Sequence, residues 1–201
     1  MSELNNLDVV GLLQEHDAIL NGHFQLPSGF HSQSYVQTSL LMQYPHIAHK
    51  VASALAGKFP NTVDVVLAPT ARVAVIAQEV ARVKKCRAIF AEKTPGGLIL
   101  KRNFKIEPGE HVLVVDDVIT TGNLTGRAVV LAQRFGAKVI GVAAIVDRST
   151  GNLSLTVPAR ALLSYPLQVY PPHKCPLCAD NIPLTVPGSP LMAGENQQEE
   201  E

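Results

Sequence analysis

Short, almost wholly apolar runs alternate along the chain with segments in which apolar residues recur every three or four positions. The first pattern is typical of buried strands, and the second of helices with one buried face. Extended segments are predicted at residues 24–26, 34–37, 63–68, 88–91, 98–104, 111–115 and 139–146. Helices are predicted at residues 7–22, 45–59, 72–84 and 123–135. The alternation favours an α/β fold in which a mainly parallel sheet is flanked by helices on both faces.

The length of 201 residues is enough for one domain with a proper core. We therefore predict a single domain over residues 1–190. After residue 150 the chain is rich in proline and shows no clear periodicity. Residues 191–201 include the tail GENQQEEE, which has no apolar side chain to bury, so we predict disorder there.

Charge and composition exclude several classes of function. The formal net charge is zero, which argues against binding nucleic acid through bulk electrostatics. No apolar run reaches the roughly 20 residues of a membrane helix, and the polar N-terminus does not resemble a signal peptide. Three cysteines do not make a disulfide framework. The expected location is the reducing cytoplasm, without a nucleic-acid or membrane partner.

The segment VLVVDDVITTGNLTG, residues 112–126, leads from a buried strand through a polar turn into a helix. Asp116 and Asp117 stand at the carboxyl end of the strand, where open parallel sheets bind ligands. The Thr-Thr-Gly turn at residues 120–122 directs backbone N–H groups and two hydroxyls at one point. Because the dipole of the following helix adds positive potential there, this turn can bind a phosphate.

The adjacent carboxylates need a separate explanation, because they would repel the phosphate itself. They are suited to accept hydrogen bonds from sugar hydroxyls, or to meet a metal ion that bridges the ligand. An Asp-Asp pair by itself is more often a solvated strand end beside a helix cap, but the whole string favours a ligand site. The chain contains neither G-x-x-x-x-G-K-[ST] nor G-x-G-x-x-G, so the usual nucleotide-binding loops are excluded.

This segment resembles the ribose-diphosphate-binding motif of the type I phosphoribosyltransferases, and the similarity is widest with the members that act on orotate. Further resemblance lies in FQLPSGFHSQSY, VLAPTARVAV, RAIFAEKTPGGLILKRNF, AAIVDRS and CPLCADNIPLTVPGS. These correspond to a hood segment, a pyrophosphate loop, a mobile catalytic loop, a base-binding strand end and a C-terminal segment. The resemblance implies the fold of that family, with a small hood formed by about residues 1–40 and the C-terminal segment.

The resemblance also implies a reaction, in which phosphoribosyl diphosphate and orotate give a nucleotide and pyrophosphate. The cofactor is Mg²⁺, which arrives with the diphosphate rather than being held by a protein cage. Expected to bind phosphoribosyl diphosphate are Arg72, Asp116, Asp117, Val118, Ile119, Thr120, Thr121, Gly122, Asn123, Leu124 and Thr125. Expected to bind the base are Thr120 and Arg148. A homodimer is implied, with the mobile loop of one subunit reaching the site of the other.

Cleavage of the bond from C1 to pyrophosphate needs cations directed at the leaving group. Lys93, Lys101 and Arg102, together with Asp117, are the expected catalytic residues. The Pro-Gly-Gly turn at residues 95–97 suggests that the loop can close over the substrate. The alternative is a solvated hairpin with basic ends. At the pyrophosphate loop, Val73 stands where the family often has glycine, and a β-branched residue does not readily adopt positive φ.

Cysteine and histidine residues offer further candidate sites, and two other functions stay open. Cys175 and Cys178 have the spacing of a metal-ligand pair with His173 nearby, but a single pair favours a structural turn with two free thiols. His23 and His31 flank the hood segment and could touch substrate, although a plain structural role is favoured. The alternatives for function are transfer to another base, such as a purine, and a regulator that binds phosphoribosyl diphosphate without turnover.

Overall fold

The computed structural model describes residues 7–149, 151 and 153–187, which fall into two compact units. The first unit comprises the described residues up to Ala18 together with Thr38–Pro166. Its elements are α1 (Val9–Glu15), α2 (Ser39–Met42), α3 (Pro45–Gly57), β3 (Val65–Ala68), η2 (Ala71–Val73), α4 (Ala74–Lys84), β4 (Arg87–Thr94), β5 (Gly97–Leu100), β6 (His111–Ile119), α5 (Asn123–Arg134), β7 (Lys138–Asp147) and β8 (Ala159–Ser164).

The second unit comprises Ile19–Gln37 and the described residues from Leu167 onward. It contains β1 (Ile19–Gln25), β2 (His31–Val36), β9 (Val169–Tyr170), η3 (Pro172–Lys174) and α6 (Pro176–Ala179). β2 pairs antiparallel with β1 on one side and with β9 on the other. Thr185 bridges to Phe24, so chain segments far apart in sequence form one small sheet.

The first unit is built on a six-stranded sheet with the order β5-β4-β3-β6-β7-β8. All neighbouring strands are parallel except the edge strand β5, which pairs antiparallel with β4. From β3 the chain moves outward to β4, and from β6 it moves outward to β7 and β8 in the opposite direction. The strand order therefore reverses between β3 and β6, and ligands bind open parallel sheets outside such a reversal point.

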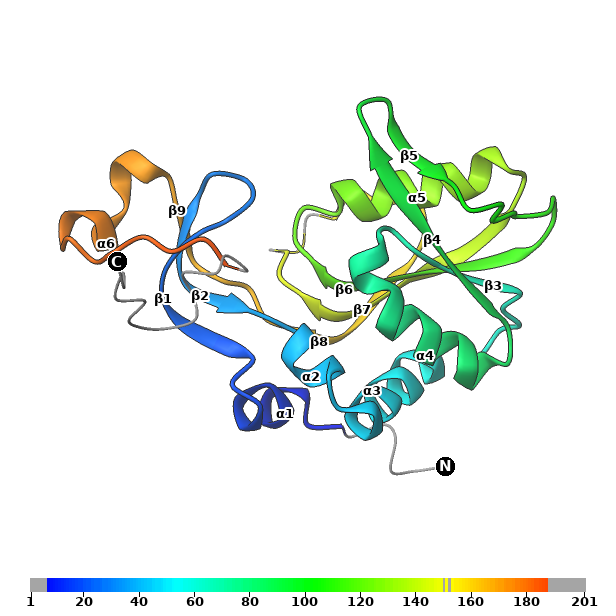
Figure 1. Ribbon diagram of the computed structural model, residues 1–201, viewed down its shortest axis with the longest axis horizontal. Coiled ribbons are helices and arrows are strands. Elements are labelled where there is room, and N and C mark those ends of the chain that lie inside the picture. The colour runs from blue at the N-terminus through cyan, green and yellow to red at the C-terminus, as the bar shows by residue number, and fades with distance from the viewer. Residues whose placement is uncertain (1–6, 150, 152, 188–201) are drawn as a thin grey trace, which may run out of the picture. The chain divides into compact units, whose positions relative to one another are not determined.

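Helices cover both faces of this sheet, with α5 on one face and α3 and α4 on the other (Figure 1). Alternate residues of each central strand point to opposite faces. Val65 and Leu67 of β3 therefore cluster with Ala128 and Val129 of α5, and all four are buried. The predicted α/β fold with a mainly parallel sheet flanked by helices is confirmed. None of the described helices is both long and apolar enough to cross a membrane.

The expected helix over residues 7–22 is wrong in its second half. The helix α1 ends at Glu15, and Asp17 adopts a left-handed conformation with φ 51° that no helix continues through. Ile19 and the residues after it instead pair with β2. The apolar residues that suggested helical spacing therefore belong to two different elements.

Two strands also differ from expectation. β6 continues to Ile119, four residues beyond the predicted end. β8 was not predicted, although it pairs in parallel with β7 at the edge of the sheet. β8 is an edge strand and is only partly buried. Its sequence therefore shows neither the continuous apolar run nor the strict alternation that would predict a strand. The tail over residues 191–201 lies outside the described residues.

Gly141 allows β7 to bulge where its register with β6 shifts. A Cβ on Gly141 would lie 2.4 Å from Cε1 of Phe59 and 2.7 Å from the carbonyl oxygen of Pro158. That same oxygen accepts the hydrogen bond from the N–H of Val142, so it is not free to move away. We expect Gly141→Ala to lower the free energy of unfolding by about 1–3 kcal/mol, as measured by urea denaturation.

The matched control is Gly57→Ala at the end of α3, where an added Cβ meets open space. Alanine favours helix over glycine, so this variant should be at least as stable as the parent chain. Equal stability of both variants would contradict the steric argument.

Candidate active site

The carboxylates of Asp116 and Asp117 lie within β6, beside the end of β3. Both strands are parallel, so their carboxyl ends open onto the same edge of the sheet, where the strand order reverses. The segment after β3 carries Arg72 in the short helix η2. Arg72 and the two aspartates are thus brought together by the reversal, although they are more than 40 residues apart in sequence.

Asp117 is held by a set of donors from three segments of the chain. Arg72 forks onto it, with Nη1 donating to Oδ2 at 3.0 Å and Nη2 donating to Oδ1 at 3.3 Å. The hydroxyl of Thr38 donates to Oδ2 at 3.0 Å, and the N–H of Val118 donates to Oδ1 at 2.9 Å. The side chain of Asp117 is 10% exposed, whereas that of Arg72 is 65% exposed. The arginine therefore covers the carboxylate from the solvent side.

Asp116 is more deeply buried and has no cation of its own among these contacts. The hydroxyl of Thr125 donates to Oδ2 at 2.6 Å, and the N–H of Asp117 donates to Oδ1 at 3.0 Å. Burial, and secondarily the negative charge of Asp117, raises the pKa of Asp116 to about 7, and the hydrogen bond from Thr125 opposes that rise. A carboxyl group with so strongly raised a pKa is a common mark of a functional site.

The expected phosphate loop connects β6 to α5 in the predicted way. Thr120, Thr121 and Asn123 are exposed, and Gly122 takes φ 73° immediately before α5. A Cβ on Gly122 would approach Leu153 to 3.1 Å, so glycine is needed there for both reasons. The first N–H groups of α5 have no partners within the helix, and that of Asn123 donates to Oγ1 of Thr121 at 3.4 Å. A helix N-terminus of this kind can bind an anion.

Three other residues of the expected loop have apolar side chains that are buried or half-buried. Ile119 is buried in the core, and Leu124 packs against that core. Val118 is half-buried at the end of β6. These three residues were predicted to bind phosphoribosyl diphosphate, and because their side chains are apolar, a hydrogen bond to a ligand would have to come from their peptide groups.

Arg148, expected at the base, follows directly after β7. Its N–H donates to the carbonyl oxygen of Ile119 at 2.8 Å, which ties it to the start of the phosphate loop. Thr120, the other expected base contact, is the next residue after Ile119. The two candidate base-binding residues therefore lie at the ends of the neighbouring strands β6 and β7.

Val73 does not need the positive φ that glycine would provide. Its φ is −92° and ψ is 0°, and its side chain is fully buried at the start of α4. None of the positive-φ residues that the structure describes lies in the segment between β3 and α4. The valine is therefore a core residue of this loop, and the expected difficulty over positive φ does not arise.

The β4–β5 hairpin carries the other expected cations. Both Lys101 and Arg102 pair with Glu92, at 3.1 Å from Nζ to Oε2 and 3.1 Å from Nε to Oε1. Hydrogen bonding from Lys101, with the nearby charge of Arg102, lowers the pKa of Glu92. Lys93 is exposed and pairs with no acidic group among the described residues. Of these three expected cations, Lys93 therefore keeps an ammonium group that no carboxylate of the described residues neutralises.

An open groove of about 690 Å³ runs between the tip of this hairpin and the phosphate loop. Gly96 and Gly97 line one side, and Thr121, Gly122 and Asn123 line the other. Asp116 and Asp117 do not line it, so the groove lies on the α5 side of the loop. The hairpin and the phosphate loop are nonetheless close enough to share this one depression.

Sequence reasoning missed two side chains of the site. Thr38 donates to Asp117 from 79 positions earlier in the chain, and no local pattern marks it. Glu92 forms ion pairs with two of the expected catalytic cations, Lys101 and Arg102. The sequence does not show which charged side chains pair with one another. The Oγ1 of Thr70, in the loop after β3, is buried without a hydrogen-bond partner among the described residues.

Known proteins are similar to this chain in both sequence and fold. The family model of the phosphoribosyl transferase domain matches residues 38–160. Orotate phosphoribosyltransferase of Caldicellulosiruptor saccharolyticus is 41% identical over 187 residues, which cover 92% of this chain and 98% of that protein. The orotate phosphoribosyltransferase of Desulforamulus reducens is 38% identical over 187 residues, with the same coverage of both chains.

Solved structures agree on the fold. Orotate phosphoribosyltransferase from Aeropyrum pernix gives a TM-score of 0.64 at 21% identity and covers 78% of this chain and 93% of that one. A phosphoribosyltransferase from Corynebacterium diphtheriae gives 0.65 at 24% identity and covers 82% and 96%. At such identities these structures support the architecture alone. The family match, in contrast, spans Thr38, Arg72, Asp117 and Arg148.

The raised pKa of Asp116 makes stability depend on pH. The carboxyl group titrates near its ordinary value of 3.8 when the chain is unfolded and at about 7 when folded. Between these values the folded state keeps a proton that the unfolded state has lost, so stability falls as pH rises. We expect Asp116→Asn to be more stable than the parent chain, with an advantage that grows by about 2 kcal/mol from about pH 5 to about pH 8.

Urea denaturation at the two pH values measures this difference. Asp180→Asn, at an exposed carboxyl group, is the matched control and should show no such pH-dependent gain. An advantage of Asp116→Asn that is equal at both pH values would show that the buried carboxyl group does not titrate between them.

Proposed function

The chain belongs to the phosphoribosyltransferase family, and we propose that it transfers the 5-phosphoribosyl group from phosphoribosyl diphosphate to orotate. The products are orotidine 5′-phosphate and pyrophosphate, in pyrimidine synthesis. One observation carries the proposal: two buried carboxylates, one of them forked by Arg72, lie directly before a phosphate loop where the strand order reverses. Relatives at 38–41% identity over nearly the whole chain support orotate as the base.

Asp116 and Asp117 are proposed to accept hydrogen bonds from the ribose hydroxyls. In the structure Arg72 forms an ion pair with the carboxylate of Asp117. The side chain of Arg72 is mostly exposed, so it can turn toward solvent. A diphosphate group carries more negative charge than one carboxylate, so it should draw the guanidinium away from Asp117. Arg72 would then bind pyrophosphate, and the released oxygens of Asp117 would become available to the sugar.

The 5-phosphate is proposed to bind at residues 120–125, on the N–H groups at the N-terminus of α5. The hydroxyls of Thr120 and Thr121 are exposed and can donate to it. Arg148 and Thr120 would contact the base, because orotate is planar and acidic and a guanidinium group forks onto a carboxylate. With the 5-phosphate held at the loop and the base held by Arg148 and Thr120, the base nitrogen would be placed to attack C1 of the ribose.

Breaking the bond from C1 to pyrophosphate develops positive charge on the ribose and negative charge on the leaving group. Lys93 is proposed to stabilise the leaving group, since no described carboxylate neutralises its ammonium. Lys101 and Arg102 would have to leave Glu92 to act in the same way. The hairpin is proposed to close over the bound diphosphate.

Mg²⁺ is proposed as the cofactor. Asp116 and Asp117 offer oxygen atoms of the type that Mg²⁺ prefers, but among the described residues no carboxylate cluster forms a cage. The residues therefore fit an ion that is held mainly by the diphosphate and approaches these two side chains with it. Bound in that way, Mg²⁺ would neutralise charge on the leaving pyrophosphate. The homodimer and the cytoplasmic location inferred from the sequence stay predictions.

The proposal is tested by turnover of the purified chain with phosphoribosyl diphosphate, Mg²⁺ and a panel of orotate, uracil, adenine and hypoxanthine. We expect pyrophosphate release with orotate alone, and none after exhaustive chelation. Release with a purine instead would replace orotate as the substrate. Tight binding of phosphoribosyl diphosphate without release of pyrophosphate in the presence of any of these bases would support the regulator instead.

Asp117→Asn should weaken binding of phosphoribosyl diphosphate roughly 10- to 150-fold, because it removes a charge-assisted hydrogen bond to the ribose. Calorimetric titration measures the affinity. Asp17→Asn is the matched control, since Asp17 is exposed and asparagine tolerates its positive φ. Unchanged affinity in Asp117→Asn would remove the carboxylate pair from the ribose site.

Lys93→Ala should lower kcat by at least about 10-fold with little change in affinity for orotate, because its charge is needed mainly in the transition state. Lys105→Ala, at an exposed lysine beyond the hairpin, should retain the parent rate. Lys101→Ala should have a smaller effect than Lys93→Ala, since Glu92 holds that lysine. If Lys93→Ala runs at the parent rate, the hairpin does not supply the catalytic cation through this residue.

A further inference from the structure

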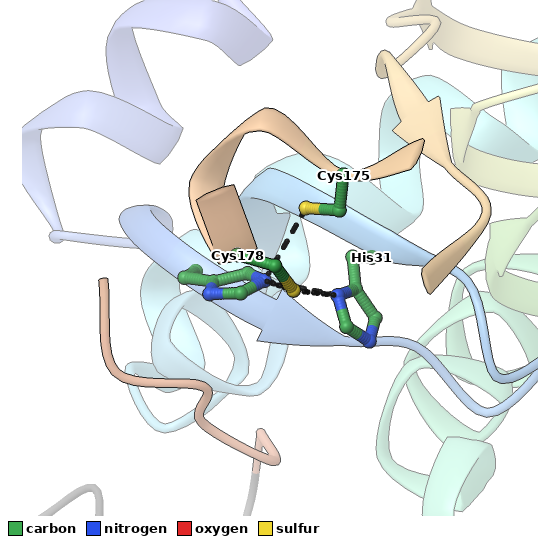
Figure 2. Close-up of side chains that lie close together, drawn as sticks. His31, Cys175 and Cys178 are labelled. Atoms are coloured by element: carbon green, nitrogen blue, oxygen red, sulfur yellow. Dashed lines mark hydrogen bonds between the residues drawn. The ribbon is translucent and has the colours of Figure 1, made fainter. Parts of the chain in front are cut away.

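The second unit contains a cluster of four metal-ligand residues that the proposed reaction does not use. These are His23, His31, Cys175 and Cys178, here called the His–Cys cluster. Each offers one nitrogen or sulfur atom, and all four atoms lie within 4.8 Å of one another. Figure 2 shows Cys175, Cys178 and His31 gathered at one point, with Cys178 next to the ring of His31. His173, the histidine nearest to Cys175 in sequence, is exposed and lies outside the cluster.

The cluster is assembled from both ends of the chain. His23 lies on β1, and His31 begins the neighbouring strand β2. Cys175 caps the N-terminus of the short helix α6, and Cys178 lies within that helix. The cysteines are about 150 positions away from the histidines. The sequence shows one cysteine pair without a second pair, and only the fold supplies the two missing ligands.

The ring of His23 is fixed in the orientation that a metal ligand needs. Its Nδ1 lies 2.7 Å from the carbonyl oxygen of Ile182, which can only accept a hydrogen bond. Nδ1 therefore carries the proton, and Nε2 is left with a lone pair that points into the cluster. Histidines that bind metals commonly donate their other N–H to a backbone carbonyl in this way.

Three groups converge on that single lone pair. Nε2 of His23 lies 3.0 Å from Nδ1 of His31, 3.5 Å from Sγ of Cys175 and 3.7 Å from Sγ of Cys178. One lone pair accepts one strong hydrogen bond, so a metal-free cluster cannot satisfy all three contacts with Nε2 at once. A cation among the four atoms would satisfy all of them at once.

The distances also fit a tetrahedron around one ion. Tetrahedral Zn²⁺, with Zn–N of about 2.0–2.1 Å and Zn–S of about 2.3 Å, places its ligand atoms about 3.3–3.8 Å apart. Four of the six separations here are 3.0, 3.3, 3.5 and 3.7 Å. Both remaining pairs involve Cys175, and all six stay within 4.8 Å. An inward shift of that thiol on the order of 1 Å would complete the geometry.

We propose that Nε2 of His23, Nδ1 of His31 and the thiolates of Cys175 and Cys178 bind one Zn²⁺ as a closed structural site. Two imidazole and two thiolate ligands in a tetrahedron are the set that selects zinc. The thiols release two protons on binding, and their two negative charges balance the ion. All four positions belong to the protein, so none is open for a substrate and the site is structural.

The second unit has reason to need such a link. It comprises only about 40 described residues, a size at which an apolar core rarely suffices. Among its described hydrophobic residues only Phe24, Val36 and Cys175 are buried, whereas Phe30 and Leu184 are exposed. A zinc ion that joins the β1–β2 hairpin to α6 would replace the missing core, as in other small zinc-dependent units.

The first test measures metal in the full-length chain, purified without chelators and analysed by inductively coupled plasma mass spectrometry. We expect about one zinc per chain. Cys178→Ser and His31→Ala should lose most of it. Cys86→Ser, at the third cysteine, and His173→Ala, at the histidine next to α6, are the matched controls and should keep it.

The second test uses the unaltered chain, so it does not depend on whether a variant folds. Zinc is removed with a chelator under reducing conditions and replaced by Co²⁺, which should give the visible absorption of a tetrahedral thiolate site. Hydrogen exchange should rise on metal removal in residues 19–37 and 167–187 and stay unchanged in β3, β6 and β7. Absence of zinc together with no cobalt absorption would overturn the proposal, as would a Cys175–Cys178 disulfide found by mass spectrometry in the freshly purified chain.

Discussion

The burial of two adjacent carboxylates at the reversal of strand order is the constraint on which the candidate active site depends. Burial of a charge without partners is strongly unfavourable, so the surrounding chain must supply donors. Arg72 and Thr38 supply them to Asp117, and Thr125 supplies one to Asp116. The loop after β3, the start of α2 and the first turn of α5 are thereby all drawn to one point.

This arrangement is costly to the free protein and suited to a ligand. Asp116 gains no cation and its pKa rises to about 7, so part of the folding free energy is spent on a group that the fold itself does not need. Arg72 shields the carboxylate of Asp117 while remaining mostly exposed. A ligand that carries sugar hydroxyls and a diphosphate would give the two carboxylates hydrogen-bond donors and give Arg72 a more highly charged partner. Residues that are held ready in this way favour binding of the ligand.

The two units are stabilised by different means. The six-stranded sheet is covered on both faces, and residues such as Leu67, Leu113 and Ile145 are completely buried. The second unit buries polar rings and a thiol where a larger unit would bury aliphatic side chains. A metal link suits that composition, because its strength comes from four coordinate bonds and does not scale with the apolar area that a short hairpin can cover.

The sequence by itself determined the α/β class, the position of the phosphate loop and the identity of most candidate site residues, because periodicity and short motifs are local. Arg72 and Asp117 were both predicted to bind the same ligand, yet their ion pair was not, since it depends on which strands are neighbours. For the same reason Thr38 and Glu92 were missed, and His23 and His31 were not connected with Cys175 and Cys178. Contacts between residues 40 to 150 positions apart are decided by strand order and register, which only the tertiary structure reveals.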